Sequence, residues 1–301
     1  MTLLGEEISD PEEETFLLYA QQPLSTLDLG FVDPRAGSVT VTVGGREVVL
    51  SQSPALLASD REGGTTGAVT PLLATWFSTS SHAATLLSAL NEPKNVLELG
   101  CGISPLTGLA FRPRASTYVF SDQGYVQRLL KRNMASAGLV EDQEEDQDHR
   151  EHQHKKQNRV GKRHFQKDRS SSSFSFRPLD WDADVVTPSF CHPAPSFDLV
   201  IASDCIFNEA LVPNFTRTCV DVCRFKVGED KNDPSSSSSS SSSCCCACVV
   251  AQQLRSHDVF RAWINLFVER FRLWRVPAEM LPVELRPESG FVIHVAVLRD
   301  P

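Results

Sequence analysis

The run Asn-Val-Leu-Glu-Leu-Gly-Cys-Gly at residues 95–102 constrains the fold more than any other part of this 301-residue sequence. Residues 96–99 are the kind of short apolar run that forms a buried strand, and Gly100 and Gly102 follow at once. Glycine permits positive φ values and a close approach of backbone to ligand where a strand turns into a helix. The run therefore predicts a strand, a glycine turn and a helix start that together hold a ligand.

Downstream of residue 80, short apolar strands alternate with amphipathic helices. We expect strands at 96–99, 118–120, 197–202, 248–251 and 290–298, a further strand before residue 179, and helices at 82–90, 123–137, 211–225 and 258–271. Strands separated by helices imply parallel pairing. The pattern predicts a Rossmann-like, doubly wound α/β sheet.

The first 79 residues predict an accessory element before this region. Residues 38–51 carry β-branched residues on both sides of Gly44-Gly45, a pair that suits a two-residue hairpin turn. Within the acidic segment 1–30, Phe16 to Tyr19 indicate a short helix. We expect an N-terminal extension with a β-hairpin over 1–79 and one ligand-binding domain over 80–301.

Two polar stretches interrupt that domain. Residues 141–173 hold acids, then bases, then a serine run, and residues 229–243 end in nine consecutive serines. Such segments bury too little apolar surface to offset the entropy of ordering them. Both are predicted to be disordered insertions with no part in the core.

Charge and cysteine content limit the class of protein. The formal net charge of −9 gives no general attraction for nucleic acid. No apolar run approaches the roughly 18 residues that a membrane helix needs, and Met1 to Glu14 carry six acids and no base, unlike a signal peptide. Nine cysteines without an export signal indicate reduced thiols. We expect a protein of the cytoplasm or nucleus, without membrane contact.

The adjacent cysteines of the run 244–248 suit a tetrahedral metal site poorly compared with spaced pairs. As the opening of an apolar strand they are ordinary core residues. No metal is expected.

Three positions near the glycine turn distinguish its possible ligands. A dinucleotide site would have a third glycine where this chain has Pro105. Glu98, two residues before the first glycine, can instead hold an ammonium, directly or through water, such as the one at the methionine end of S-adenosylmethionine. Asp122 lies 20 residues beyond Gly102, where a carboxylate can accept hydrogen bonds from ribose hydroxyls. A methyl donor is favoured over a nicotinamide cofactor, with a plain strand–turn–helix junction as the alternative.

Two further motifs would complete a methyl-transfer site. Asp180 can accept a hydrogen bond from an adenine amino group while Trp181 packs on the base, although a ligand-free surface pair is the alternative. Ser203 and Asp204 end an apolar strand at the sheet edge where doubly wound folds bind ligands. Methyl transfer depends mainly on positioning, and lysine, with a pKa of ~10.4, must arrive deprotonated. Asp204 is expected to orient the amine, Phe207 to face its cationic form, and the proton to leave to water.

These motifs together resemble the seven-β-strand protein-lysine methyltransferases of methyltransferase family sixteen. The matching segments are 96–104, 121–123, 179–181 and the strand ending at Asp204, while segments 250–256, 258–260 and 290–294 look most like the fungal ribosomal members. The resemblance implies a class I, seven-stranded sheet and S-adenosyl-L-methionine as cofactor. It further implies lysine methylation of a large-subunit ribosomal protein, with nucleic acid met at most through the ribosome.

By that resemblance the cofactor residues are Gly100, Cys101, Gly102, Asp122, Trp181 and Ser203, and Asp204 lies at the acceptor end. Two departures stand out. The family has Asp-x-x-Tyr where this chain has Asp204-Cys-Ile-Phe207, and the family's Trp shortly after a Thr-Gly pair is missing after Thr66-Gly67. Trp76, just downstream, is not assigned that role.

Two other functions remain open from the sequence. A methyltransferase for nucleic-acid amines would normally carry Asn/Asp-Pro-Pro-Tyr/Phe after the fourth strand, and residues 203–207 contain no proline. A non-catalytic binding protein could keep the fold while losing its hold on the cofactor.

Overall fold

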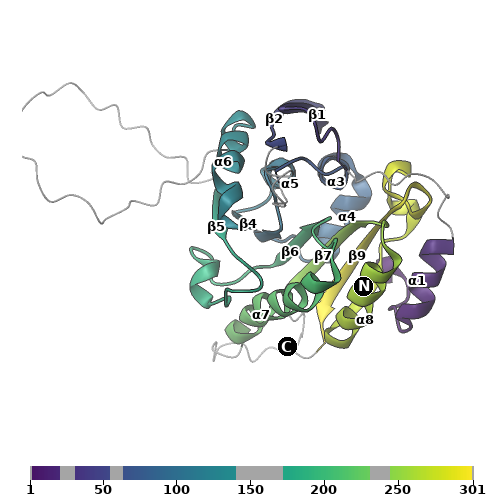
Figure 1. Ribbon diagram of the computed structural model, residues 1–301. Helices are drawn as coiled ribbons and strands as arrows, with labels where there is room; N and C mark the ends of the chain where they lie inside the picture. Colours follow the sequence, from purple (N-terminus) through teal and green to yellow (C-terminus); the bar gives the residue numbers. More distant parts are fainter. Residues whose placement is uncertain (1, 21–30, 55–63, 140–171, 231–244, 300–301) are drawn as a thin grey trace, which may run out of the picture.

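A mixed, seven-stranded sheet organises the residues that the computed structural model describes, namely 2–20, 31–54, 64–139, 172–230 and 245–299 (Figure 1). Its strand order is β5-β4-β3-β6-β7-β9-β8. The strands are β3 (Asn95–Leu99), β4 (Thr117–Asp122), β5 (Ser173–Pro178), β6 (Leu199–Ser203), β7 (Ala247–Gln253), β8 (Phe271–Arg275) and β9 (Phe291–Leu298).

The first five of these strands, β3 to β7, pair in parallel, and within this sheet β9 runs antiparallel to its neighbours β7 and β8. From β3 the chain proceeds outward through β4 and β5, then returns to the other side of β3 with β6. The predicted Rossmann-like, seven-stranded α/β sheet is confirmed. Its chain order reverses between β3 and β6, which is where doubly wound folds open a crevice for ligands.

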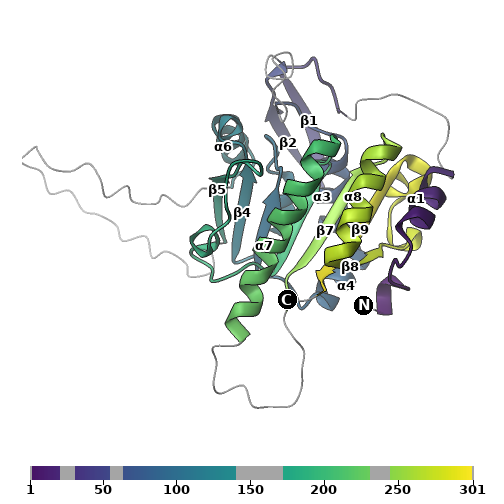
Figure 2. The same ribbon diagram turned by 60° about the horizontal axis from the view of Figure 1, so that its bottom comes forward.

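Helices cover both faces of the sheet (Figures 1 and 2). They are α1 (Pro11–Ala20), α3 (Val69–Thr79), α4 (Ser81–Ala89), α5 (Leu106–Phe111), α6 (Gln127–Ser136), α7 (Val212–Asp230) and α8 (His257–Arg270). Alternate residues of each strand enter opposite cores, so that Val96 packs with α3 to α6 and Leu97 packs with α1, α7 and α8. Burial on both faces explains why the strands read as continuous apolar runs.

The N-terminal residues contribute to both cores. Strands β1 (Ser38–Val43) and β2 (Arg46–Ser51) form the predicted hairpin, and both turn glycines have positive φ, +58° at Gly44 and +77° at Gly45. The hairpin buries alternate valines against α3 and α6. Helix α1 confirms the predicted short helix and packs along α8, with Leu18 fully buried.

Two element boundaries differ from the predictions. The helix expected to run to Phe271 ends at Arg270, and Phe271 begins β8, a strand that the sequence did not predict. This strand has only five residues, and no glycine or proline separates it from the helix. The local sequence therefore gives no signal that the helix ends and a strand begins. Strand β5 begins at Ser173, inside the stretch 141–173 that was expected to be an insertion. Its neighbours 140–171, and residues 231–244 of the second insertion, lie outside the described residues.

None of the described helices is both long enough and apolar enough to cross a membrane. Cysteines from α7 and β7 meet in one core, and the Cys223 and Cys248 sulfurs lie 3.6 Å apart. In the described part of the chain, no three His, Cys, Asp or Glu side chains are grouped so that they could hold a metal ion.

Candidate functional site

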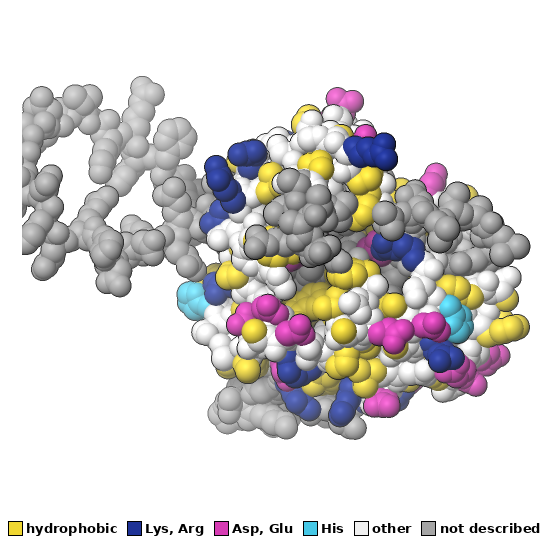
Figure 3. Space-filling model, viewed as in Figure 1, with side chains coloured by type: hydrophobic (Ala, Val, Ile, Leu, Met, Phe, Trp, Pro, Cys, Tyr) yellow, Lys and Arg dark blue, Asp and Glu magenta, His cyan; other side chains and the backbone are white. Residues whose placement is uncertain are grey.

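A cavity of about 870 Å³ lies over the carboxyl ends of the five parallel strands. Its wall consists of the loops that follow β3, β4, β5, β6 and β7, closed on one side by Phe31 and residues 65–70. Of the predicted site residues, all but Glu98 line it: Gly100, Cys101, Gly102, Asp122, Asp180, Trp181, Ser203, Asp204 and Phe207. In the space-filling view, apolar side chains gather in a hollow near the middle of one face, with acidic side chains beside it (Figure 3).

The turn after β3 has the positive-φ backbone for which the sequence analysis expected glycine. Gly100 and Gly102 adopt φ values of +65° and +55°. A Cβ on Gly100 would lie 2.4 Å from the Cβ of Cys205, so a side chain there would push apart the loops after β3 and β6. Only glycine therefore allows these two loops to approach and form one continuous wall.

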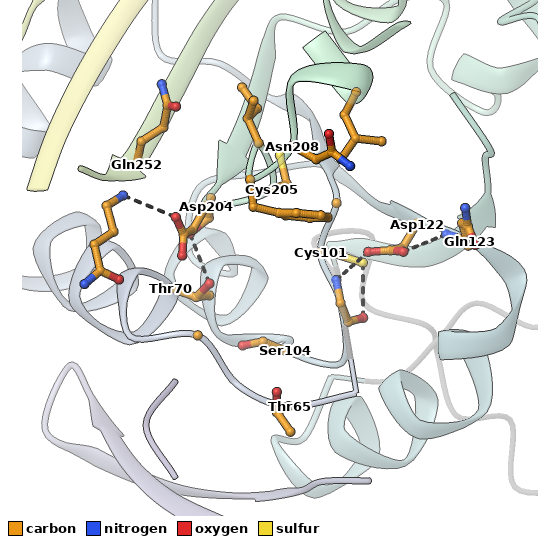
Figure 4. Close-up of a pocket in the computed structure, with 18 of the residues that line it drawn as sticks. Thr65, Thr70, Cys101, Ser104, Asp122, Gln123, Asp204, Cys205, Asn208 and Gln252 are labelled. Atoms are coloured by element: carbon orange, nitrogen blue, oxygen red, sulfur yellow. Dashed lines mark hydrogen bonds between the residues drawn. The ribbon is translucent and has the colours of Figure 1, made fainter. Parts of the chain in front are cut away.

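Asp122, at the end of β4, fixes this turn and faces the cavity. Its Oδ2 accepts a hydrogen bond from the Gly102 N–H at 2.8 Å, and its Oδ1 accepts one from the Gln123 N–H at 2.7 Å (Figure 4). Burial raises the pKa of Asp122 to about 6, although both N–H groups act to lower it. The carboxylate is ionised at neutral pH, and each oxygen keeps a lone pair for a ligand.

Glu98 does not lie where the prediction requires. Its side chain is 1% exposed, and the Tyr118 hydroxyl donates to its Oε2 at 2.7 Å. It shares a sheet face with Val96, so it points into the helix-covered core and not toward the end of the strand. Burial raises its pKa to about 8, against the lowering effect of Tyr118. A carboxyl that is neutral at pH 7 and absent from the cavity wall does not hold a ligand ammonium.

Trp181 and Asp180 line the cavity after β5. The Trp181 ring packs edge-on against Phe215 with centroids 5.3 Å apart, and its buried indole N–H has no hydrogen-bond partner among the described residues. Asp180 Oδ1 accepts from the Asp182 N–H at 3.0 Å, which orients the carboxylate within a local turn. An aromatic ring beside an oriented carboxylate is the arrangement that the sequence predicted for a purine.

Ser203 and Asp204 line the cavity after β6, on the side away from Asp122 (Figure 4). The Ser203 hydroxyl lies 3.0 Å from that of Thr70. Asp204 adopts a left-handed backbone with φ of +55°, a conformation that costs a non-glycine residue ~1–3 kcal/mol and recurs at functional sites. Its Oδ1 accepts from the Gln253 N–H at 3.2 Å, and its Oδ2 is paired with the Arg255 guanidinium.

Burial raises the pKa of Asp204, and Arg255 opposes that rise. Phe207 borders the same end and is 43% exposed, which is unusual for a phenylalanine in this protein. Figure 4 shows Asp204 with Thr70 and Gln252 on one side of the cavity, and Asp122 with Cys101 and Gln123 on the other.

Several lining residues were not predicted from the sequence. Buried polar atoms without a hydrogen-bond partner in the described chain belong to residues that line the cavity: the hydroxyls of Thr65, Thr66 and Ser104 and the amide nitrogen of Gln252. Buried polar groups are normally satisfied, so unsatisfied ones around a cavity point to a ligand. Gln252 directly follows the predicted strand 248–251 and Arg255 lies four residues beyond its end, and this position alone could have identified them.

The missing tryptophan has no replacement in Trp76. That side chain is 1% exposed and donates from Nε1 to the Met280 carbonyl at 2.9 Å, inside the core. The aromatic residue beside the Thr66-Gly67 pair is Phe31, which lines the cavity and forms an isolated β-bridge with Gly67. The tertiary structure therefore places the aromatic ring of Phe31 beside Thr66-Gly67 in the cavity wall, although the two segments are more than thirty residues apart in the sequence.

The charge of the cavity favours a cationic ligand. Four carboxylates line it, from Asp122, Asp180, Asp182 and Asp204. Among the described lining residues the only Lys, Arg or His is Arg255. In a partly enclosed site these charges act at low effective dielectric, which strengthens their attraction for positive charge.

Comparisons with known proteins match parts of this chain. The family described as "Lysine methyltransferase" matches residues 145–227, less than half of the chain, which include β5, β6 and most of α7. A Schizosaccharomyces pombe protein named diaminohydroxyphosphoribosylamino-pyrimidine deaminase is 29% identical over 131 residues, which are 42% of this chain and 31% of that protein. The chain thus spans about a third of that longer relative.

Similar solved structures include three methyltransferases in complex with S-adenosyl-L-homocysteine. The Pyrococcus abyssi tRNA (uracil-54, C5)-methyltransferase is 13% identical with a TM-score of 0.40, over 87% of this chain and 44% of that one. The N-methyltransferase NodS of Bradyrhizobium japonicum is 11% identical with a TM-score of 0.40, over 73% and 86% of the two chains. An O-methyltransferase of Bacillus cereus is 12% identical with a TM-score of 0.39, over 72% and 80%.

Proposed function

We propose that this protein is an S-adenosyl-L-methionine-dependent protein-lysine N-methyltransferase that acts on a large-subunit ribosomal protein. The observation that carries the proposal is one acidic cavity that brings together the glycine turn, Asp122, Trp181, Asp204 and Phe207. The lysine methyltransferase match over residues 145–227 supports the choice of acceptor. The ribosomal target rests on the resemblance of the C-terminal segments 250–256 and 290–294 to ribosomal members of that family.

The residues present fit this cofactor. Asp122 offers free carboxylate lone pairs to ribose hydroxyls, and Asp180 with Trp181 suits an adenine base. The unsatisfied hydroxyls of Thr65, Thr66 and Ser104 suit the polar amino-acid end. When bound, S-adenosyl-L-methionine supplies an electrophilic methyl group on a positively charged sulfur. Glu98 has no part in this binding, because it lies in the core.

The acceptor end positions an amine. Asp204 is held rigidly by Gln253 and Arg255, so its carboxylate can orient an amino group without moving. The exposed Phe207 ring can pack against the aliphatic part of a lysine side chain and attract its cationic form during entry. The nitrogen must be deprotonated to react, and its proton leaves to solvent.

Cofactor binding is tested first by calorimetry with S-adenosyl-L-methionine. Asp122→Ala removes the ribose acceptor and is expected to weaken affinity ~10- to 100-fold, as loss of hydrogen bonds to a charged group predicts. Asp221→Ala, a partly exposed carboxylate on α7 paired with Arg224, is the control and should bind like the wild type. Absence of binding at millimolar cofactor would overturn the proposed function.

The acceptor is tested with labelled cofactor and ribosomes from cells that lack this protein. We expect label in a large-subunit protein that protease releases and nuclease does not, with mass spectrometry locating it on lysine. Asp204→Asn should retain cofactor binding and lose the labelling. Label released by nuclease would instead establish the nucleic-acid amine methyltransferase.

A further inference from the structure

Arg255 occupies an unusual position for a positive charge. It follows β7 and is the only Lys, Arg or His among the described residues that line the cavity. Its guanidinium is paired with Oδ2 of Asp204, the carboxylate at the proposed acceptor end. The pair is poorly hydrated, with the Asp204 and Arg255 side chains 10% and 29% exposed.

A lone carboxylate at this place would hinder the reaction. It would stabilise an arriving amine as the ammonium ion, which has no lone pair with which to attack a methyl group. A positive charge about 5 Å away acts in the opposite sense and lowers the pKa of an amine by roughly two units at an effective dielectric constant of about 20. Arg255 therefore offsets a large part of the rise in amine pKa that Asp204 alone would cause, while Asp204 can still accept a hydrogen bond from the amine.

We propose that Arg255 is a positioning residue of the acceptor end, which holds Asp204 in place and raises the fraction of the arriving amine that is in its neutral, nucleophilic form. The amine gives its proton to solvent as it binds, so no base in the protein has to take that proton. This inference rests on the proposed function.

Two helices in the described part of the chain contribute charged or titratable groups near Arg255. Helix α8 contributes His257 and Asp258, which contact each other with 3.3 Å between Nδ1 and Oδ1. Helix α1 contributes the half-buried Tyr19, whose hydroxyl experiences the charges of both Arg255 and Asp258. Tyr19 packs edge-on against His257, with ring centroids 5.1 Å apart. None of these three side chains lines the cavity, whereas Arg255 and Asp204 do.

The inference can be tested without knowing the substrate. The probe is an S-adenosyl-L-homocysteine analogue in which nitrogen replaces sulfur and carries a 3-aminopropyl arm, so that its primary amine reaches the acceptor end. The control ligand carries a 3-hydroxypropyl arm of similar size and no charge. Calorimetry between pH 6 and pH 9, in buffers with different ionisation enthalpies, gives the affinity and the number of protons released for each ligand.

Between pH 6 and pH 9, the aminopropyl probe should release more protons on binding to the wild type than on binding to Arg255→Gln, measured relative to the hydroxypropyl control. Arg255→Gln should also bind this probe roughly 10- to 100-fold more tightly at pH 7, relative to the same control. Arg255→Lys keeps the charge and should behave like the wild type. Asp204→Asn leaves the positive charge of Arg255 without its carboxylate partner. It should therefore weaken binding of the aminopropyl probe, which is the opposite of the change expected for Arg255→Gln.

Equal pH dependence and equal proton release in the wild type and Arg255→Gln would overturn the inference. The Asp204→Asn variant gives an independent test, because unchanged or tighter binding of the aminopropyl probe would overturn it as well. Binding of S-adenosyl-L-homocysteine itself distinguishes failure of the proposed function from failure of the inference about Arg255. If this parent ligand fails to bind the wild type, the proposed function is wrong. If it binds all variants equally, and substitution of Arg255 does not change the binding of the aminopropyl probe, only the inference is wrong.

Discussion

Residues with the same chemistry have different roles in this protein because their burial differs. Asp122 and Glu98 both end up near the glycine turn, yet Asp122 faces the cavity and Glu98 lies in the core. Both carboxyls have a raised pKa because burial disfavours their charged form. Only Asp122, at about 6, is ionised at neutral pH and able to act as an acceptor there.

Glu98 predicts a measurable pH dependence of stability. Its pKa rises from 4.5 in the unfolded chain to about 8 in the folded protein, so the folded state binds the extra proton between these values. The free energy of unfolding should therefore fall as pH rises from about 5 to 8, by at most ~1.4 kcal/mol per pH unit from this group. Glu98→Gln, which is neutral and similar in shape, should remove that part of the slope.

Urea unfolding at pH 5, 6, 7 and 8 measures the slope for each protein. The exposed Glu47→Gln on the hairpin serves as the control and should keep the wild-type slope. A Glu98→Gln slope equal to that of the wild type would show that Glu98 is ionised in the folded state.

At the level of elements, one buried side chain connects the hairpin to the glycine loop. Asn133 on α6 is 0% exposed. Its Oδ1 accepts from the Ser51 N–H at 2.8 Å, and its Nδ2 donates to the carbonyls of Ser51 at 3.0 Å and Ile103 at 2.9 Å. The N-terminal hairpin thus supports the loop that carries Gly100 and Gly102.

Asn133→Leu should leave three backbone groups without partners. Each such group costs ~1–3 kcal/mol if it stays buried, so we expect the protein to lose about 3 kcal/mol of stability. Because the Ile103 carbonyl belongs to the cavity loop, affinity for S-adenosyl-L-methionine should fall as well. Denaturant unfolding and calorimetry measure the two effects.

Ser136→Ala is the matched control for this prediction. It removes one exposed hydrogen bond, from Oγ to the Val49 carbonyl at 3.2 Å, at the same junction of α6 and hairpin. It should change stability by less than about 0.5 kcal/mol. If Asn133→Leu lowers stability but leaves cofactor affinity unchanged, the hairpin supports the fold without supporting the loop.

At the level of the whole molecule, the first helix is held by the last strand. Glu14 on α1 accepts at 3.1 Å from His294 Nε2 on β9, and its other oxygen lies 3.5 Å from Arg275. His294 is fully buried and Glu14 is 6% exposed. Burial acts to raise the pKa of Glu14, but the hydrogen bond and charge of His294, together with Arg275, outweigh it and hold that pKa below 4.5.

Glu14→Ala should destabilise the protein by about 3 kcal/mol, since removing one member of a buried ionic group leaves its partners unpaired. The contribution of Glu14 is fully present above pH 4.5 and should be lost as pH falls through the lower pKa of the folded state. Thermal unfolding between pH 3 and pH 7 checks both statements. Glu13→Gln, an exposed neighbour, should unfold like the wild type at every pH; an equal loss in both variants would contradict the specific role of Glu14.

Sequence alone determined the sheet class, the hairpin, the glycine turn and the placement of Asp122, Trp181 and Asp204 at one edge. These features are local or periodic: apolar runs alternate with amphipathic helices, and the carboxyl ends of parallel strands must share an edge. Side-chain chemistry at a strand end can therefore be read without coordinates.

Only the tertiary structure decided which side chains reach the cavity and what charge they carry. Glu98 turns into the core because of its face on β3, Phe31 and Thr65 arrive from the N-terminal segment, and Arg255 comes to Asp204 from the next strand. Strand β8 also depends on a contact between separate segments, because it forms by pairing with β9. Contacts between distant segments, and the burial that shifts a pKa, depend on how the elements pack, and no local pattern in the sequence records that packing.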